Sequence, residues 1–187
     1  IPMVKSFKMP AEEDGLLVVH QESVEKSTEA NETPAPLVIV NLNLGTETTI
    51  QRVTEYEVAQ KGGNVIAEQA RNQKDSLTKT LLLLINATTK QHDTIATGGN
   101  DFRSFTFSED GTRLAFLAER DARPKELIKY YKLFLFRAMD DTARQIVDRN
   151  TMGMRLGYTV SEFGKPRFSK SGSRLYFGAA PIKSAAD

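Results

Sequence analysis

The sequence predicts an all-β fold, a partial β-propeller of about three and a half four-stranded antiparallel blades. Three observations support this fold class. A glycine-containing hairpin pattern recurs at a nearly regular interval, and a second pattern of apolar and then polar residues lies between its copies. In addition, no long segment shows the periodicity of an amphipathic helix.

The hairpin pattern consists of an apolar or aromatic segment, a polar turn with glycine, and a second apolar segment. Its copies are FKMPAEEDGLLVVHQE (7–22), YEVAQKGGNVIAEQAR (56–71), FTFSEDGTRLAFLAERD (105–121) and PRFSKSGSRLYFGAAP (166–181). Successive copies are 47, 49 and 61 residues apart, measured between the turn glycines Gly15, Gly62, Gly111 and Gly172. Repeat periods of roughly 40–50 residues are typical of propeller blades.

Residues next to these turns alternate between apolar and polar. Phe105 and Phe107 precede the turn SEDG, and Leu114 and Phe116 follow it. Alternation with period two predicts strands with one buried face. The final glycine of SEDG, and of SKSG in the last copy, is expected to supply the positive φ that hairpin turns require.

The second pattern predicts another hairpin in each period. Its copies are LVIVNLNLGTETTI (37–50), LLLLINATTKQHDTIA (81–96) and KLFLFRAMDDTARQIVD (132–148). Each reads as a buried strand, a tight turn and a polar edge strand. Two hairpins per period give four antiparallel strands, which is one propeller blade.

The order of these hairpins gives the predicted organisation of the chain, a single partial propeller over residues 1–187. Blades are expected at about 4–52, 53–97 and 102–148, and the first hairpin of a fourth blade at about 163–180. Two insertions are expected, at 22–36 and 149–164. The best helical candidate is 124–131, where a loop with one helical turn is expected, and its tyrosines should begin the third strand of the blade.

Composition and motifs argue against chemistry within this chain. The 25 basic and 24 acidic side chains leave a net charge of +1, which does not favour nucleic-acid binding. There is no cysteine, and no apolar run reaches the roughly 18 residues of a membrane span. His20 and His92 have no evident catalytic partners, Asp140 and Asp141 lack the spacing of a calcium loop, and no G-x-S-x-G elbow is present. We therefore expect no catalytic residue, cofactor or metal site.

The segments FSEDGTRLAF and FSKSGSRLYFG resemble blade hairpins of the prolyl oligopeptidase family of serine peptidases and of TolB-like or WD-like propellers. The succession FLAERD, KYYKLFLF, GYTVSE and PRFSKSGSRLYFGAAPIK is similar to part of the N-terminal propeller of large bacterial members of that family. The resemblance covers nearly the whole chain and is weakest over residues 1–36.

This resemblance implies a function for a longer parent protein. In that family the propeller precedes an α/β-hydrolase domain with catalytic Ser, Asp and His and restricts entry to peptides. The implied function is a non-catalytic segment that gates or orients peptides for this domain, in the periplasm or cell envelope of a bacterium, although the cytoplasm remains open. A TolB-like periplasmic scaffold that binds proteins and has no enzymatic domain is the alternative. A glycan-binding propeller is less favoured because the chain has no Trp.

The resemblance also suggests a substrate-facing loop. Some dipeptidases of the family hold the amino group of the substrate with propeller carboxylates, and Glu119, Arg120 and Asp121 leave a second blade strand where loops can face the catalytic side. A surface ion-pair cluster is the alternative for these residues. An open arc of blades is further expected to self-associate through its apolar edges, and two such chains would give seven blades.

Overall fold

The computed structural model describes residues 1–10, 12, 14–23, 34–72, 75, 77–123 and 125–183. These residues form strands, turns and irregular segments, and none of them is helical. In the segment predicted as a loop with one helical turn, the Glu126 N–H bonds to the Arg123 carbonyl at 3.0 Å. Most of the insertion predicted at 22–36 lies outside the described residues. The chain divides into two compact units, Ile1–Thr97 and Gly98–Asp187.

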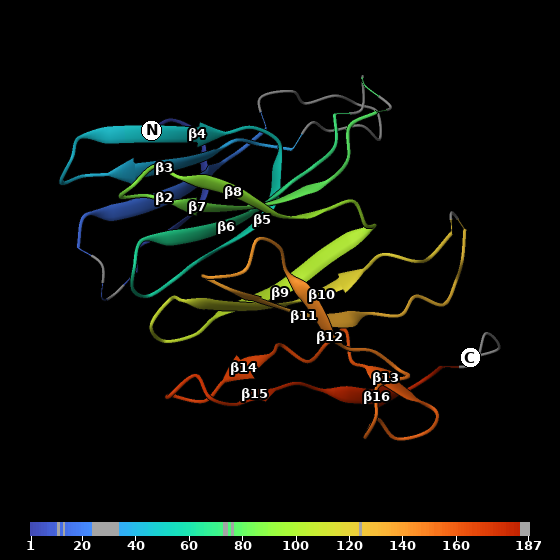
Figure 1. Cartoon of the computed structure of the whole chain (residues 1–187). Coiled ribbons are helices and arrows are strands. Elements are labelled where there is room, and N and C mark those ends of the chain that lie inside the picture. Colours follow the sequence, from blue (N-terminus) through green and yellow to red (C-terminus); the bar gives the residue numbers. More distant parts are fainter. Residues whose placement is uncertain are drawn as a thin grey trace. The chain divides into compact units, whose positions relative to one another are not determined.

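The first unit contains two four-stranded antiparallel sheets (Figure 1). One consists of β1 (Val4–Lys8), β2 (Leu16–Gln21), β3 (Leu37–Asn41) and β4 (Thr46–Ile50). The other consists of β5 (Val53–Val58), β6 (Asn64–Gln69), β7 (Leu81–Asn86) and β8 (His92–Thr97). In both sheets each strand pairs with its neighbours in sequence, which is the meander of a propeller blade.

A shared apolar core joins these two sheets. It consists of Leu16, Val18, Leu37, Ile39 and Ile50 from the first sheet and its edge, with Val53, Tyr56, Val58, Val65, Ala67, Ile85 and Ala87 from the second sheet and its turns. Polar contacts supplement this core. His20 is buried and bonds through Nε2 to the Val53 carbonyl at 2.9 Å, and Lys8 pairs with Glu57 at 2.8 Å. The imidazole must be protonated at Nε2, because a carbonyl oxygen can only accept.

The second unit contains one four-stranded antiparallel sheet and a further hairpin (Figure 1). The sheet consists of β9 (Asp101–Phe107), β10 (Arg113–Glu119), β11 (Lys132–Arg137) and β12 (Arg144–Val147), again in sequence order. In the hairpin, β13 (Tyr158–Val160) pairs with β16 (Ala179–Pro181), and β14 (Arg167–Phe168) pairs with β15 (Leu175–Tyr176).

The last hairpin is longer than predicted. It begins at Tyr158, inside the segment expected to be an insertion, and it is interrupted between the two short ladders. Gly164 and Gly178 face each other at this interruption, where a Cβ built on Gly164 would lie 3.0 Å from the Gly178 Cα. The absence of two side chains therefore lets the two strands approach closely between the ladders.

Strand β10 also differs from the prediction, because both of its faces are buried. The residues from Leu114 to Ala118 are all 0% exposed. Ala115 and Leu117 pack with Phe168 and Leu175 of the last hairpin. On the other face the Phe116 ring lies 5.4 Å from the Phe134 ring and 6.0 Å from that of Phe105. The expectation of one buried face is wrong for this strand, since a propeller blade is covered on both sides.

The predicted turns recur with the same hydrogen bonds. The φ angles of Gly15, Gly62, Gly111 and Gly172 are 81°, 81°, 70° and 67°. In the last two turns the N–H of the first serine bonds to the arginine carbonyl five residues later, at 2.9 Å in both. The equivalent bond in the second sheet, from Ala59 to Asn64, is also 2.9 Å. These turns join the first two strands of each blade.

Candidate functional site

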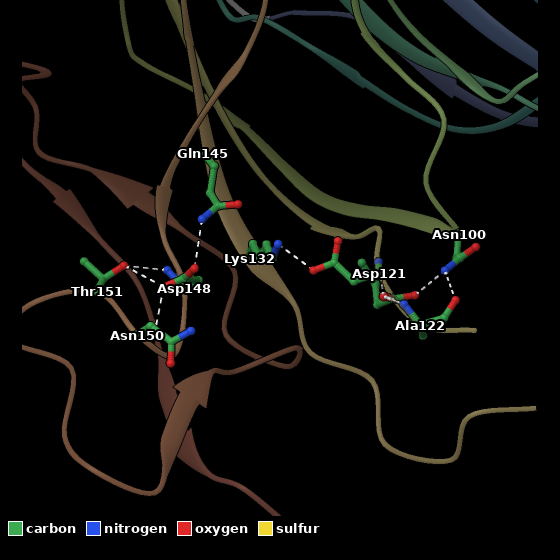
Figure 2. Close-up of polar contacts among 9 residues, drawn as sticks. Asn100, Asp121, Ala122, Lys132, Gln145, Asp148, Asn150 and Thr151 are labelled. Carbon is green, nitrogen blue, oxygen red and sulfur yellow. Dashed lines mark hydrogen bonds and ion pairs between the residues drawn. The ribbon is translucent and has the colours of Figure 1, made fainter. Parts of the chain in front are cut away.

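Three connections meet at one edge of the β9–β12 sheet. Antiparallel pairing brings the start of β9, the end of β10, the start of β11 and the end of β12 to this edge. A cavity of about 210 Å³ opens there. It is lined by Glu119, Asp121, Ala122, Glu126, Ile128, Tyr130, Tyr131, Lys132, Asp148, Arg149 and Asn150. We call this space the polar cavity, and Figure 2 shows the hydrogen bonds and ion pairs around it.

Glu119 anchors the connection that follows β10. Its side chain is buried, with 1% exposed. Oε1 accepts from the main-chain N–H groups of Asp121 and Ala122 at 2.8 and 2.7 Å, and Oε2 accepts from the Asn100 side-chain amide at 2.7 Å. A buried carboxylate with three donors is well compensated, so Glu119 fixes the loop conformation.

The other two residues of the predicted loop are more accessible. Asp121 is 65% exposed and pairs with Lys132 at 2.5 Å (Figure 2). Arg120 places its guanidinium 5.7 Å from the Phe134 ring and is not among the residues that line the polar cavity. The structure thus brings Glu119 and Asp121 to one cavity, in different roles, and leaves Arg120 outside it.

Asp148 shapes the opposite wall of the polar cavity. Its Oδ1 accepts from the Asn150 N–H at 2.9 Å and the Thr151 hydroxyl at 3.0 Å, and Oδ2 accepts from the Gln145 amide at 3.0 Å (Figure 2). The bond from the Asn150 N–H is the main reason that the pKa of Asp148 is lowered. Sequence reasoning missed this residue, although Asp-x-Asn-Thr after a strand is a signal for an Asx turn.

Arg149 brings a positive charge to the polar cavity and lies over the Tyr130 ring. The Arg149 guanidinium carbon lies 4.2 Å from the centre of the Tyr130 ring. Both side chains come from connections, Tyr130 from the one before β11 and Arg149 from the one after β12. Sequence reasoning did not single out Arg149, because the two residues are brought together only by pairing of β11 with β12.

Tyr131 has a structural role next to this site. Its hydroxyl donates to Asp101, Arg103 lies 4.6 Å from its ring, and Arg103 also pairs with Glu162 at 3.3 Å. Burial raises the pKa of the Tyr131 hydroxyl, and the bond to Asp101 adds to this effect. The prediction that the tyrosines begin the third strand is wrong: β11 begins at Lys132, and Tyr131 bridges to Val160 of the last hairpin.

A second cavity of about 470 Å³ lies on the other side of the tyrosines. Ile128, Tyr130 and Tyr131 line both cavities. The remaining lining residues are Leu127, Lys129, Thr159, Val160, Ser161, Glu162, Phe163, Ala180, Pro181, Ile182 and Lys183. This larger cavity is more apolar in its side chains than the first.

Among the described residues there is no group of three His, Cys, Asp or Glu side chains that could hold a metal ion. The part of the chain that the structure describes likewise contains no helix able to cross a membrane. The polar cavity offers carboxylates, amides and cations whose positions are set by strand ends.

Comparison with known proteins identifies the fold of the chain. No family model and no curated protein matches the sequence. Among solved structures, the tricorn protease matches 93% of the chain with a TM-score of 0.62 and 10% identity. The acylaminoacyl peptidase of Pyrococcus horikoshii matches 87% with a TM-score of 0.55 and 11% identity. The chain is a partial β-propeller.

This partial β-propeller is also similar to TolB from Acinetobacter baumannii, over 91% of the chain with a TM-score of 0.51 and 11% identity. The predicted all-β fold class is therefore confirmed. The resemblance noted in the sequence holds for the fold, since the neighbours are propellers of peptidases and TolB. The chain spans 15%, 26% and 36% of the lengths of the tricorn, acylaminoacyl peptidase and TolB chains.

Proposed function

We propose that this partial propeller belongs to a serine peptidase and that it gates and orients peptide substrates for an α/β-hydrolase domain. The observation that supports this most strongly is its likeness to the tricorn protease and acylaminoacyl peptidase over 93% and 87% of the chain. The hydrolase domain is the proposed partner and a peptide the proposed ligand. We extend the proposal to a location in the periplasm or cell envelope of a bacterium.

The loop-bearing edge of the second unit is suited to this function. The two cavities at this edge have volumes of about 210 and 470 Å³, and they share a wall of aromatic and aliphatic side chains. Ligand sites commonly combine such apolar walls with a few fixed polar groups. A blade edge of this kind can hold a peptide while another domain supplies the nucleophile.

A scaffold without an enzymatic domain is the second candidate function. The likeness to TolB favours it, and so do exposed apolar side chains that suit protein contacts. Phe7 is 63% exposed on β1, and Phe163 is 80% exposed beside the larger cavity. Self-association through such surfaces belongs to the same proposal, and a molar mass for one chain at all concentrations in light scattering would count against it.

A serine-hydrolase probe separates the two functions. The natural gene product would be captured from its source cells with an antibody raised against residues 1–187 and treated with a fluorophosphonate-biotin probe. We expect one labelled serine, located by mass spectrometry outside these 187 residues, and loss of labelling after heat denaturation. An intact product that takes up no probe and contains only further blades would instead support the scaffold.

Gating would then be tested with paired substrates. A short peptide and the same sequence placed in a loop of a stably folded protein would be offered to a portion of the captured protein that has not been treated with the probe. We expect cleavage of the free peptide alone. Equal cleavage of both would mean that the propeller does not restrict access, whatever the probe result.

A further inference from the structure

We propose that Arg149, with Tyr130 and Asn150, forms a binding site for a carboxylate of the peptide ligand in the polar cavity. The inference rests on the proposed function, because the ligand is a peptide that the propeller orients. The carboxylate is either a free C-terminus or an acidic side chain, since both present the same two oxygens.

The acidic groups of the polar cavity already have donors. Glu119 accepts three hydrogen bonds, and Asp148 accepts three from Asn150, Thr151 and Gln145. Asp121 is paired with Lys132, and Glu126 accepts from the Arg123 N–H at 2.8 Å. A ligand that offers only donors would therefore have to compete with bonds that hold the loops in place.

Lys132 is paired with Asp121, but three other donors of the polar cavity, on Arg149, Tyr130 and Asn150, have no such partner among the described residues. Within the described part of the chain, the Arg149 guanidinium forms no ion pair, and it lies over the Tyr130 ring. Neither the Tyr130 hydroxyl nor the Asn150 side-chain amide bonds to another described residue. Arg149 and Asn150 are exposed at the cavity, so their donors are accessible to a ligand that accepts hydrogen bonds.

The charge of the surrounding connections supports an anionic ligand. Residues 119–132 and 148–155 together carry seven basic and four acidic side chains. The four acids are the same four that line the polar cavity and already have donors. The cavity lining alone has more acids than bases, so attraction to an anion depends on direct contact with Arg149 and on the wider basic edge.

The geometry of Arg149 suits a carboxylate. A guanidinium can bind both oxygens with two parallel N–H bonds, and stacking on an aromatic ring orients its plane. The volume of about 210 Å³ accommodates the end of a peptide. The larger cavity, reached past Tyr130, can take a neighbouring apolar side chain.

The test uses the 187-residue chain and four N-terminally labelled peptides of one length. Two peptides differ only in a free or an amidated C-terminus, and two amidated peptides differ only in an internal Glu or Gln. Fluorescence anisotropy at low salt should show about tenfold tighter binding of one acidic peptide than of its neutral partner. The pair that shows the difference identifies which carboxylate is bound.

Variants of two arginines complete the test. Arg149→Ala should abolish the preference for the acidic peptide, and Arg149→Lys should retain part of it, because lysine keeps the charge but not the paired N–H groups. Arg155→Ala is the matched control: Arg155 also stacks on a tyrosine, 4.8 Å from the Tyr158 ring, but it does not line the polar cavity. Unchanged circular dichroism would show that the variants fold.

Three results would overturn the site. These are equal binding of acidic and neutral peptides, an acid preference that survives Arg149→Ala, and no binding of any peptide. None of them depends on the hydrolase domain, so the fluorophosphonate experiment still decides the proposed function by itself. If the probe labels a serine but the chain shows no preference for acidic peptides, the proposed peptidase function stands and the propeller binds peptides at a site other than the polar cavity.

Discussion

The guanidinium of Arg113, at the start of β10, donates a hydrogen bond to the main-chain carbonyl oxygen of Gly172, in the turn between β14 and β15. Both residues lie in copies of the same turn, which runs from Ser108 to Arg113 and from Ser169 to Arg174. In each copy the first serine hydroxyl accepts from the arginine N–H, at 3.0 and 3.1 Å. One copy of the repeated turn therefore holds the next copy in place.

This contact predicts the effect of adding a methyl group at Gly172. Gly172→Ala places a Cβ in a backbone conformation with φ of 67°, 3.1 Å from the Arg113 guanidinium. The backbone strain alone should lower the unfolding free energy by about 1–2 kcal/mol, and the clash with Arg113 should add to it. Gly153→Ala is the control, because Gly153 has a φ of 91° and no heavy atom within 4 Å of the added Cβ. Urea denaturation should show Gly172→Ala as the less stable variant, and equal losses would mean that the contact contributes nothing.

The two copies of the turn also predict that substitutions at Asp110 and at Ser171 affect stability at low pH differently. Asp110 accepts from the Ser108 hydroxyl at 2.5 Å and from the Thr112 N–H at 3.0 Å, and these bonds lower the pKa of Asp110 to about 2. The second copy has Ser171 at the equivalent position. A lowered carboxyl pKa stabilises the fold above the unfolded pKa of about 3.9 and loses this effect as the pH falls towards 2.

Asp110→Ser should therefore be less stable than the wild type at pH 6, with a difference that shrinks between about pH 4 and pH 2. The measurement is the midpoint of urea unfolding at several pH values. Ser171→Ala in the other turn is the control and should show no comparable dependence on pH in this range. A constant difference between Asp110→Ser and the wild type down to pH 2 would contradict the assignment.

Removing the buried carboxylate of Glu119 should lower the unfolding free energy. Glu119→Ala leaves the Asp121 and Ala122 N–H groups and the Asn100 amide without their acceptor. We expect a loss of about 1–2 kcal/mol, because these donors are only partly buried and the Asn100 amide keeps its bond to the Ala122 carbonyl at 3.0 Å. Glu119→Gln keeps one acceptor oxygen and should lose less. If both variants are within about 0.5 kcal/mol of the wild type in urea denaturation, Glu119 does not anchor the loop.

His20 predicts a dependence of stability on pH near neutrality. Burial lowers the pKa of His20 from its ordinary value of 6.5, and the positive charge of Lys5 lowers it further, although the bond to the Val53 carbonyl opposes both effects. The unfolded chain then binds a proton more readily, so the unfolding free energy should fall as the pH drops below about 6.5. His20→Gln should reduce this fall, because glutamine can donate to Val53 without titrating. His92→Gln, at an exposed position, should leave the fall unchanged in thermal unfolding between pH 5 and 7.5.

The fold was predictable because each blade repeats a local pattern. Phe105 and Leu114 mark buried strand positions on either side of a polar turn, and both are at most 1% exposed. Such a pattern involves residues that are close together in the sequence, so it can be detected in a single sequence. The end of the last hairpin was less clear, since Tyr158 pairs with Pro181 across a long separation and no local pattern specifies that pairing.

The candidate site could be predicted only in part. Glu119 and Asp121 were singled out from their position after a strand, but their burial and partners could not be read from it. Arg149 stacks on Tyr130, and the two lie in different connections that meet only through sheet pairing. Contacts of this kind depend on the register of β11 and β12, which the sequence does not state.

The bond between Arg113 and Gly172 has a consequence for how such proteins can evolve. Arg174 occupies in the last turn the position that Arg113 occupies in the turn before it. A further copy of the turn, placed against the last one in the same way, would present its glycine carbonyl to Arg174. Duplication of one blade would thus supply both the arginine and the glycine carbonyl that join it to the next blade. The number of blades could change in evolution without a new contact between blades.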